Sequence, residues 1–173
     1  RLLEGNVSDI LADMPKATGD IDRIKRLIER GSALALALDK WLSAGLWVLT
    51  RSDPDYPQKL KQRLGKNSPA LFFGSGSRVL LNKGGLAVIG SRNAGEDDLA
   101  YTSAIGIKSA ESGISIISGG ARGVDQTAMQ GALHAEGTAI GILGDSLLRA
   151  SMSRKYRNAL ISSNLALIST FNP

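Results

Sequence analysis

The sequence predicts an α/β fold: a Rossmann-like parallel sheet with helices on both faces, preceded by a small helical N-terminal domain. From Ala70 onward, short apolar runs alternate with amphipathic or alanine-rich stretches of helix length. Continuous hydrophobicity is typical of parallel strands that are buried on both faces. Before that point, apolar residues mostly recur at helical spacing. These two patterns divide the chain into a helical N-terminal part and a sheet-forming C-terminal part.

Residues 1–45 are expected to form the helical domain. Three amphipathic segments follow one another, and Pro15, Gly31 and Gly45 end them. Proline and glycine at such positions stop helices.

Residues 46–69 are expected to connect the two domains. They begin with a short β-type run, Leu46–Thr50. The prolines and aspartates of Asp53–Pro57 then mark a turn, and a further helix is predicted over residues 58–64.

Residues 70–173 are expected to form the sheet domain, because five apolar runs of strand length occur there. The expected strands are Ala70–Phe73, Leu86–Gly90, Ser115–Ser118, Ala139–Leu143 and Leu165–Ser169. The chain starts with Arg1 and stops at Pro173, just past the last of these runs. We therefore expect a piece of a longer protein, with this domain incomplete at its C-terminal end.

The composition excludes several classes of protein. The 173 residues are 43% hydrophobic and 21% charged, which is typical of globular domains. There is no cysteine and only one histidine, His134, so we expect no metal site and no cofactor. No apolar run is long enough to span a membrane, and a cytoplasmic protein is expected. The net charge of +5 favours a polyanionic partner.

The candidate site lies in the loops that follow the strands, because ligands of open parallel sheets bind beyond the carboxyl ends of the strands. Residues 90–95 and 118–125 each combine small residues with one arginine, Arg92 and Arg122. Small residues let the backbone approach an anion, and arginine offers a fork of donors to a phosphate. The segment 149–157 adds four further cations.

We therefore expect phosphate or nucleic-acid binding, with no catalytic residue. The candidate ligands are Gly90, Ser91, Arg92, Ser118, Gly119, Gly120, Arg122, Arg154, Lys155 and Arg157. Hydroxyl groups and backbone N–H groups of the small residues would serve as additional donors. Tyr156, among the cations, is either a base-stacking surface or part of a solvated face. Asp125 is expected to cap the helix that follows it, since a carboxylate would repel phosphate.

Two nucleotide-binding motifs are absent. No GxGxxG occurs, so a dinucleotide site is not predicted. Gly90 and Gly95 have P-loop spacing, but Glu96 and Asp97 stand where lysine and serine or threonine are required. A nucleoside triphosphatase is thus not expected.

Taken in order, the motifs resemble those of the DNA-processing protein A family (DprA, also called Smf). The resemblance covers residues 46–173. The loop motifs that carry it are Val88–Arg92, Ser118–Asp125 with Ala128, and Gly137–Leu143, and the flanking motifs are Asp53–Pro57 with Leu60, and Leu167–Thr170. It implies an extended Rossmann-like domain that binds single-stranded DNA in a basic pocket. It further implies a protein that hands the strand to a RecA-type recombinase in natural transformation (competence) or DNA recombination, and that acts as a homodimer without catalysis.

Three departures predict a divergent branch of that family. Met129 stands where the family has histidine, and Thr170 stands where it has glutamate. A Tyr-Pro pair is missing after Gly144. Two alternatives stay open from the residues: a nucleotide-sensing Rossmann-like domain and, less supported, a phosphoribohydrolase of the LOG type. The latter needs a Pro-Gly-Gly-x-Gly-Thr loop with a glutamate, which the chain lacks.

Overall fold

The computed structural model describes residues 21–144 and 147–173, and these residues separate into two compact units between Lys40 and Trp41. The first unit consists of helix α2 (Ile21–Ile28) and most of α3 (Gly31–Ser43). These match the second and third expected helices, whereas the expected helix over residues 7–14 lies outside the described residues.

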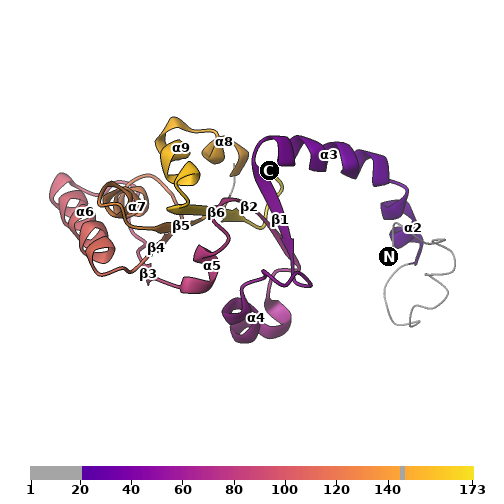
Figure 1. Cartoon of the computed structure of the whole chain (residues 1–173), viewed down its shortest axis with the longest axis horizontal. Coiled ribbons are helices and arrows are strands. Elements are labelled where there is room, and N and C mark those ends of the chain that lie inside the picture. The colour runs from indigo at the N-terminus through magenta and orange to yellow at the C-terminus, as the bar shows by residue number, and fades with distance from the viewer. Residues whose placement is uncertain (1–20, 145–146) are drawn as a thin grey trace. The chain divides into compact units, whose positions relative to one another are not determined.

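The second unit is a six-stranded sheet with helices on both faces, an α/β fold of the Rossmann-like type (Figure 1). The strands are β1 (Leu46–Thr50), β2 (Leu71–Gly76), β3 (Leu86–Ala87), β4 (Ile116–Ser118), β5 (Ala139–Ile142) and β6 (Leu165–Ser169). The helices are α4 (Gln58–Leu64) with the 3-10 turn Gly65–Asn67, α5 (Leu80–Lys83), α6 (Glu96–Glu111), α7 (Val124–His134), α8 (Leu147–Ser151) and α9 (Arg154–Ile161). The strand order is β1-β2-β6-β5-β4-β3.

The four strands from β3 to β6 are parallel, but β2 runs antiparallel to β6 and to β1. The prediction of a parallel sheet from Ala70 onward is therefore wrong for its first strand. Only residues 77–85, which include α5, link β2 to β3 across the width of β6, β5 and β4. So short a link stays at one edge of the sheet, and β2 therefore runs opposite to β3. The chain enters β3 from the edge of the sheet where β2 ends.

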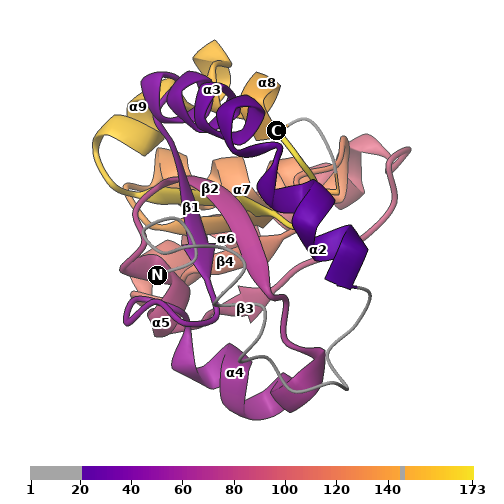
Figure 2. The ribbon, with the colours of Figure 1, turned by 90° about the vertical axis from the view of Figure 1, so that its right-hand side faces the viewer.

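The segment 46–69 is more than a connection. Its apolar run forms β1, which pairs with β2 along its whole length, as Figure 2 shows. Trp47 and Leu49 pack with Tyr56 and Phe72 in a core of their own. The Tyr56 hydroxyl donates to the carbonyl oxygen of Pro69 at 2.8 Å, which fastens the turn to the start of β2.

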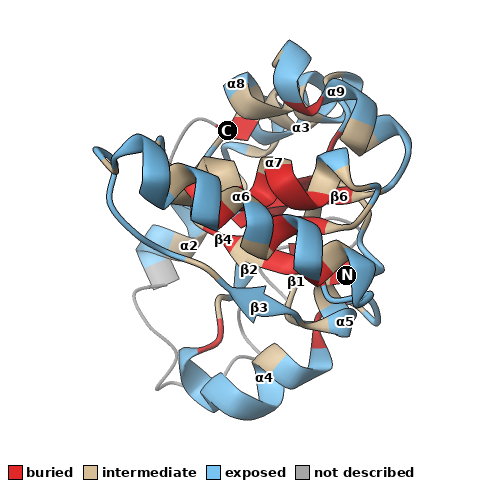
Figure 3. Ribbon diagram, turned by 90° about the vertical axis from the view of Figure 1, so that its left-hand side faces the viewer, coloured by how far each residue is buried: buried red, intermediate tan, exposed pale blue. Residues whose placement is uncertain are grey.

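Side chains alternate between the two faces of the sheet, as the period of two in a strand requires. Ile116, Ala139 and Leu165 lie in one core with residues of α7, α8 and α9. Ile140 and Ala166, one residue further along their strands, pack against α5 on the opposite face. Burial follows the same arrangement: the side of α7 that meets the sheet is buried, while α6 outside it is largely exposed (Figure 3).

Candidate nucleic-acid interface

Three loops that carry the candidate residues meet at one edge of the sheet. β3, β4 and β5 are adjacent and parallel, so their carboxyl ends lie side by side. Residues 88–95, 119–123 and 143–144 follow these ends. The loops of Arg92 and Arg122 are thus neighbours, as the sequence predicted.

Asp125 joins the first two loops. Its carboxylate accepts hydrogen bonds from the backbone N–H of Gly90 at 3.2 Å and from that of Gly119 at 3.1 Å. The side chain is buried. The role expected from the sequence was a helix cap, but α7 begins after Gly123 and has no side-chain cap bond. Asp125 is architectural in a different way: it holds two strand ends together.

Gly123 brings the same two loops into close contact. Its φ of +89° lies in the left-handed region, and a Cβ there would come within 2.3 Å of the Ser91 carbonyl oxygen. That carbonyl oxygen also accepts a hydrogen bond from the N–H of Val124 at 3.1 Å. Only glycine meets both requirements.

We therefore expect Gly123→Ala to lower the free energy of unfolding by at least about 1–3 kcal/mol, the cost of a strained backbone conformation. Gly113→Ala is the matched control, because Gly113 has a φ of +68° but a Cβ there would meet nothing within 4 Å. Chemical denaturation of both variants measures the difference. Equal losses of stability would show that the contact with Ser91 does not matter.

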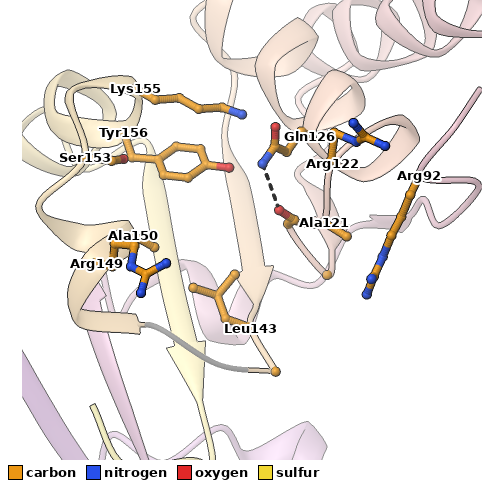
Figure 4. Close-up of a pocket in the computed structure, with 13 residues that line it drawn as sticks. Arg92, Ala121, Arg122, Gln126, Leu143, Arg149, Ala150, Ser153, Lys155 and Tyr156 are labelled. Carbon is orange, nitrogen blue, oxygen red and sulfur yellow. Dashed lines mark hydrogen bonds between the residues drawn. The ribbon is translucent and has the colours of Figure 1, made fainter.

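A cavity of about 800 Å³ opens beside these loops. Arg92 and Arg122 lie on one side of it, and α8 and α9 contribute the opposite side, with Leu143 between them (Figure 4). The lining residues are Arg92, Gly119, Gly120, Ala121, Arg122, Gln126, Leu143, Gly144, Arg149, Ala150, Ser153, Lys155 and Tyr156.

The lining is strongly cationic. Within the described residues, the lining contains three arginines and Lys155 but no acidic residue, and no described carboxylate forms an ion pair with these four cations. The backbone N–H groups of Gly120, Ala121 and Arg122, which precede α7, form no hydrogen bond with any described residue. Free N–H groups and the positive end of a helix dipole both favour an anion.

Two contacts organise the cations. The Arg122 guanidinium donates to the side-chain oxygen of Asn93, which links it to the loop of Arg92. The Lys155 ammonium lies 5.2 Å from the centre of the Tyr156 ring. Burial lowers the pKa of Lys155 and raises the pKa of the Tyr156 phenol. A bound phosphate would oppose the first shift, because it stabilises the ammonium form.

Five candidate residues line the cavity: Arg92, Gly119, Gly120, Arg122 and Lys155. The other five, namely Gly90, Ser91, Ser118, Arg154 and Arg157, are not among its lining residues.

Several donors expected for phosphate are used inside the protein. The Ser118 hydroxyl donates to the Val88 carbonyl oxygen at 2.6 Å, and Ser118 is buried. The Ser91 hydroxyl differs from these donors: its oxygen accepts from the N–H of Asn93 at 3.0 Å, and its hydrogen can still be donated. The N–H groups of Gly90 and Gly119 are held by Asp125. The expectation that the Ser118 hydroxyl and the N–H groups of Gly90 and Gly119 face an anion is therefore corrected, because each already has a partner inside the protein.

Four polar residues that line the cavity were not among the ten candidate ligands: Gln126, Arg149, Ser153 and Tyr156. The sequence offered a signal for Arg149 and Tyr156, which lie in the basic segment after β5. Tyr156 is 5% exposed, so its ring is neither an open stacking surface nor part of a solvated face. Gln126 donates from its side chain to the Gly120 carbonyl oxygen at 3.2 Å, a contact with no sequence signature.

A second, smaller hollow of about 350 Å³ adjoins Arg92 and Arg122. It reaches the N-terminal ends of α6 and α7, and Asn93, Thr127 and Gln130 contribute polar groups. Gln126 lines both hollows. Within residues 21–144 and 147–173, no helix has the length and apolar character required to cross a membrane, and no cluster of His, Asp or Glu could hold a metal ion.

Comparison with known proteins gives a family and a fold. The family model described as DNA recombination-mediator protein A matches residues 47–173. DNA processing protein A from Streptococcus pneumoniae has a similar structure, with a TM-score of 0.70 and 21% identity over 98% of this chain and 58% of that chain.

DNA processing protein A from Helicobacter pylori, described with a single-stranded DNA binding mode, gives a TM-score of 0.55. It is 23% identical, over 74% of this chain and 56% of that one. The chain thus spans somewhat more than half the length of each solved relative. Comparison with curated protein sequences found no match.

Proposed function

The chain belongs to the DNA recombination-mediator protein A family through residues 47–173, and on this basis we propose that it binds single-stranded DNA at the carboxyl edge of its sheet. The observation that carries the proposal is the cationic cavity. Arg92 and Arg122 face Arg149 and Lys155 across it, and no acid is among the lining residues that the structure describes. A DNA strand in the cavity would therefore have cations beside its phosphates on both sides of the cavity.

Arg92 and Arg122 are the proposed ligands of successive phosphates. They stand in adjacent loops, and Asn93 joins the Arg122 side chain to the loop of Arg92. A guanidinium group can donate two parallel hydrogen bonds to the oxygens of one phosphate, and it retains its charge at any physiological pH. Arg154 and Arg157, exposed on α9 outside the cavity, are proposed to attract the strand at longer range.

A small-nucleotide sensor is the competing function, because a cavity of about 800 Å³ lies in the range of small-molecule sites. Binding of oligo-dT about 4, 8 and 16 nucleotides long separates the two, with mononucleotides and cyclic nucleotides as competitors. We expect affinity to rise with strand length and mononucleotides to compete weakly, because each further phosphate adds a contact. Tight binding that does not depend on length would contradict the proposal and favour the sensor.

The proposed role is DNA processing, in which the bound strand is presented to a RecA-type recombinase during natural transformation or recombination. We propose that the protein acts as a homodimer and has no turnover of its own. The description of the family as a recombination mediator supports the role in recombination. Purified protein that accelerates recombinase loading on single strands would agree with this role. Steady release of phosphate from ATP that is lost on mutation of Arg92 would contradict the absence of turnover.

A further inference from the structure

The segment between β1 and β2 carries a cluster of exposed cations. Lys59, Lys61 and Arg63 lie on α4, and Lys66 follows in the 3-10 turn. We refer to these four residues as the α4 cations. All four are exposed, and none forms an ion pair with a described carboxylate. The sequence offers them no acid nearby on the C-terminal side, because positions 56–95 contain none.

These charges do not serve the hydrophobic core. Leu60 is the one residue of α4 that is not exposed, and it packs beside Tyr56 and Phe72. Lys59 and Arg63 stand four residues apart, on the same face of the helix, and like charges at this spacing destabilise a helix. The fold therefore carries an electrostatic cost at α4, which a bound polyanion would offset.

The segment is nevertheless held firmly at its base. The N–H of Arg51 donates to the carbonyl oxygen of Ala70 at 2.9 Å, and the Arg51 guanidinium donates to the carbonyl oxygen of Ser68. The Lys61 ammonium donates to the Arg51 carbonyl oxygen at 3.2 Å. Lys61 thus serves the segment itself, whereas the other three α4 cations make no hydrogen bond from their side chains to a described residue. These three are available to a ligand.

Strand topology places α4 at the same edge of the sheet as the cationic cavity. β1 and β6 both run antiparallel to β2, so β1 is parallel to β6. The segment 51–70 therefore lies beyond the carboxyl ends of the parallel strands, and α4 stands beyond that end of β1 in Figures 1 and 2. Four strand spacings of about 4.8 Å separate β1 from β4, the strand before Arg122, which gives a lateral distance of about 19 Å.

We propose that Lys59, Arg63 and Lys66 bind backbone phosphates of the DNA strand where it continues from the cavity along the carboxyl edge. This inference rests on the proposed function, because Arg92 and Arg122 would hold the first part of the strand. The shared edge favours DNA over an acidic protein surface, since one strand can engage both groups of cations at once and gain affinity from each.

The distance sets the strand length that this second contact needs. At about 3.4 Å per stacked nucleotide, about 19 Å corresponds to about six nucleotides. A strand of about 4 nucleotides held at the cavity does not reach α4, whereas one of about 16 nucleotides does, and both lengths lie in the range of single-strand sites.

The test measures both strand lengths with the double variant Lys59→Gln/Arg63→Gln. We expect the variant to bind the long oligo-dT about tenfold more weakly, as two exposed charge pairs can contribute, and to bind the short one like the wild type. The slope of log affinity against log salt should fall by about 1.4 for the long strand alone, or about 0.7 for each phosphate contact. Without DNA the variant should unfold at the wild-type temperature or higher, because two like charges are removed.

The matched control is Lys83→Gln/Lys108→Gln, which removes two exposed lysines at the amino edge of the sheet. It should bind the long strand like the wild type. An equal loss in this control, an equal loss on both strand lengths, or an unchanged affinity for the long strand would overturn the inference. If long-strand affinity were unchanged but recombinase loading were lost, α4 would instead contact an acidic protein surface. Failure of the proposed function looks different, because Arg92→Ala would then leave the short strand unaffected.

Discussion

Replacing Arg92 and Arg122 together with alanine is expected to weaken the binding of oligo-dT by about two to four orders of magnitude. Charge-assisted hydrogen bonds contribute about 1.5–3 kcal/mol each, and a factor of ten corresponds to about 1.4 kcal/mol. The salt dependence should change as well. If each arginine neutralises one phosphate, the slope of log affinity against log salt should fall by about 1.4, or about 0.7 for each contact.

The control for this prediction is Lys83→Ala. Lys83 is exposed at the end of α5, just before β3, and therefore lies at the amino edge of the sheet. It carries the same charge as an arginine but faces none of the three loops. A loss at Lys83 as large as that at a single arginine would mean diffuse attraction to a basic protein, with no defined phosphate site.

Asp125→Ala is expected to lower the free energy of unfolding by about 2–4 kcal/mol, because it removes the acceptor of two backbone N–H groups. Denaturant unfolding measures this. Oligo-dT binding should weaken too, although the substitution removes a negative charge near the anion site. Charge alone would strengthen binding, so a loss identifies positioning of the two loops as the larger effect.

Asp125→Asn refines this experiment, because an amide oxygen accepts in place of only one of the two carboxylate oxygens. We expect an intermediate loss of stability. An Asp125→Ala variant with wild-type stability and wild-type affinity would show that the loops keep their places without the carboxylate.

The sequence predicted those parts of the fold that depend on local pattern. The run Leu165–Ser169 is the observed β6, and Gln58–Leu64 is the observed α4, because hydrophobic period and the neighbouring turn residues decide them. The direction of β2 was missed, since an apolar run has no sense of direction and the short link to β3 decides it. The membership of β1 in the sheet likewise depends on long-range pairing with β2.

The candidate site was likewise predictable where local pattern and strand topology decide it, and not where helix packing decides it. Small residues and arginines after strands predicted Arg92 and Arg122 as neighbours, because parallel topology alone brings these loops together. The opposite side of the cavity could not be predicted in detail. Whether Lys155 or Arg157 faces the cavity depends on how α9 packs, and both are cations on the same short helix. The bond from Asp125 to Gly90 joins positions 35 residues apart and has no sequence signal.

The central claim is that one DNA strand crosses the carboxyl edge of the sheet with its phosphates at Arg92 and Arg122. A crystal structure of the protein with oligo-dT tests it most directly. We expect phosphate oxygens within about 2.7–2.9 Å of both guanidinium groups, the usual length of a charge-assisted hydrogen bond, with the strand running into the cavity beside Lys155. A strand bound elsewhere, with both arginines free of phosphate, would contradict the claim.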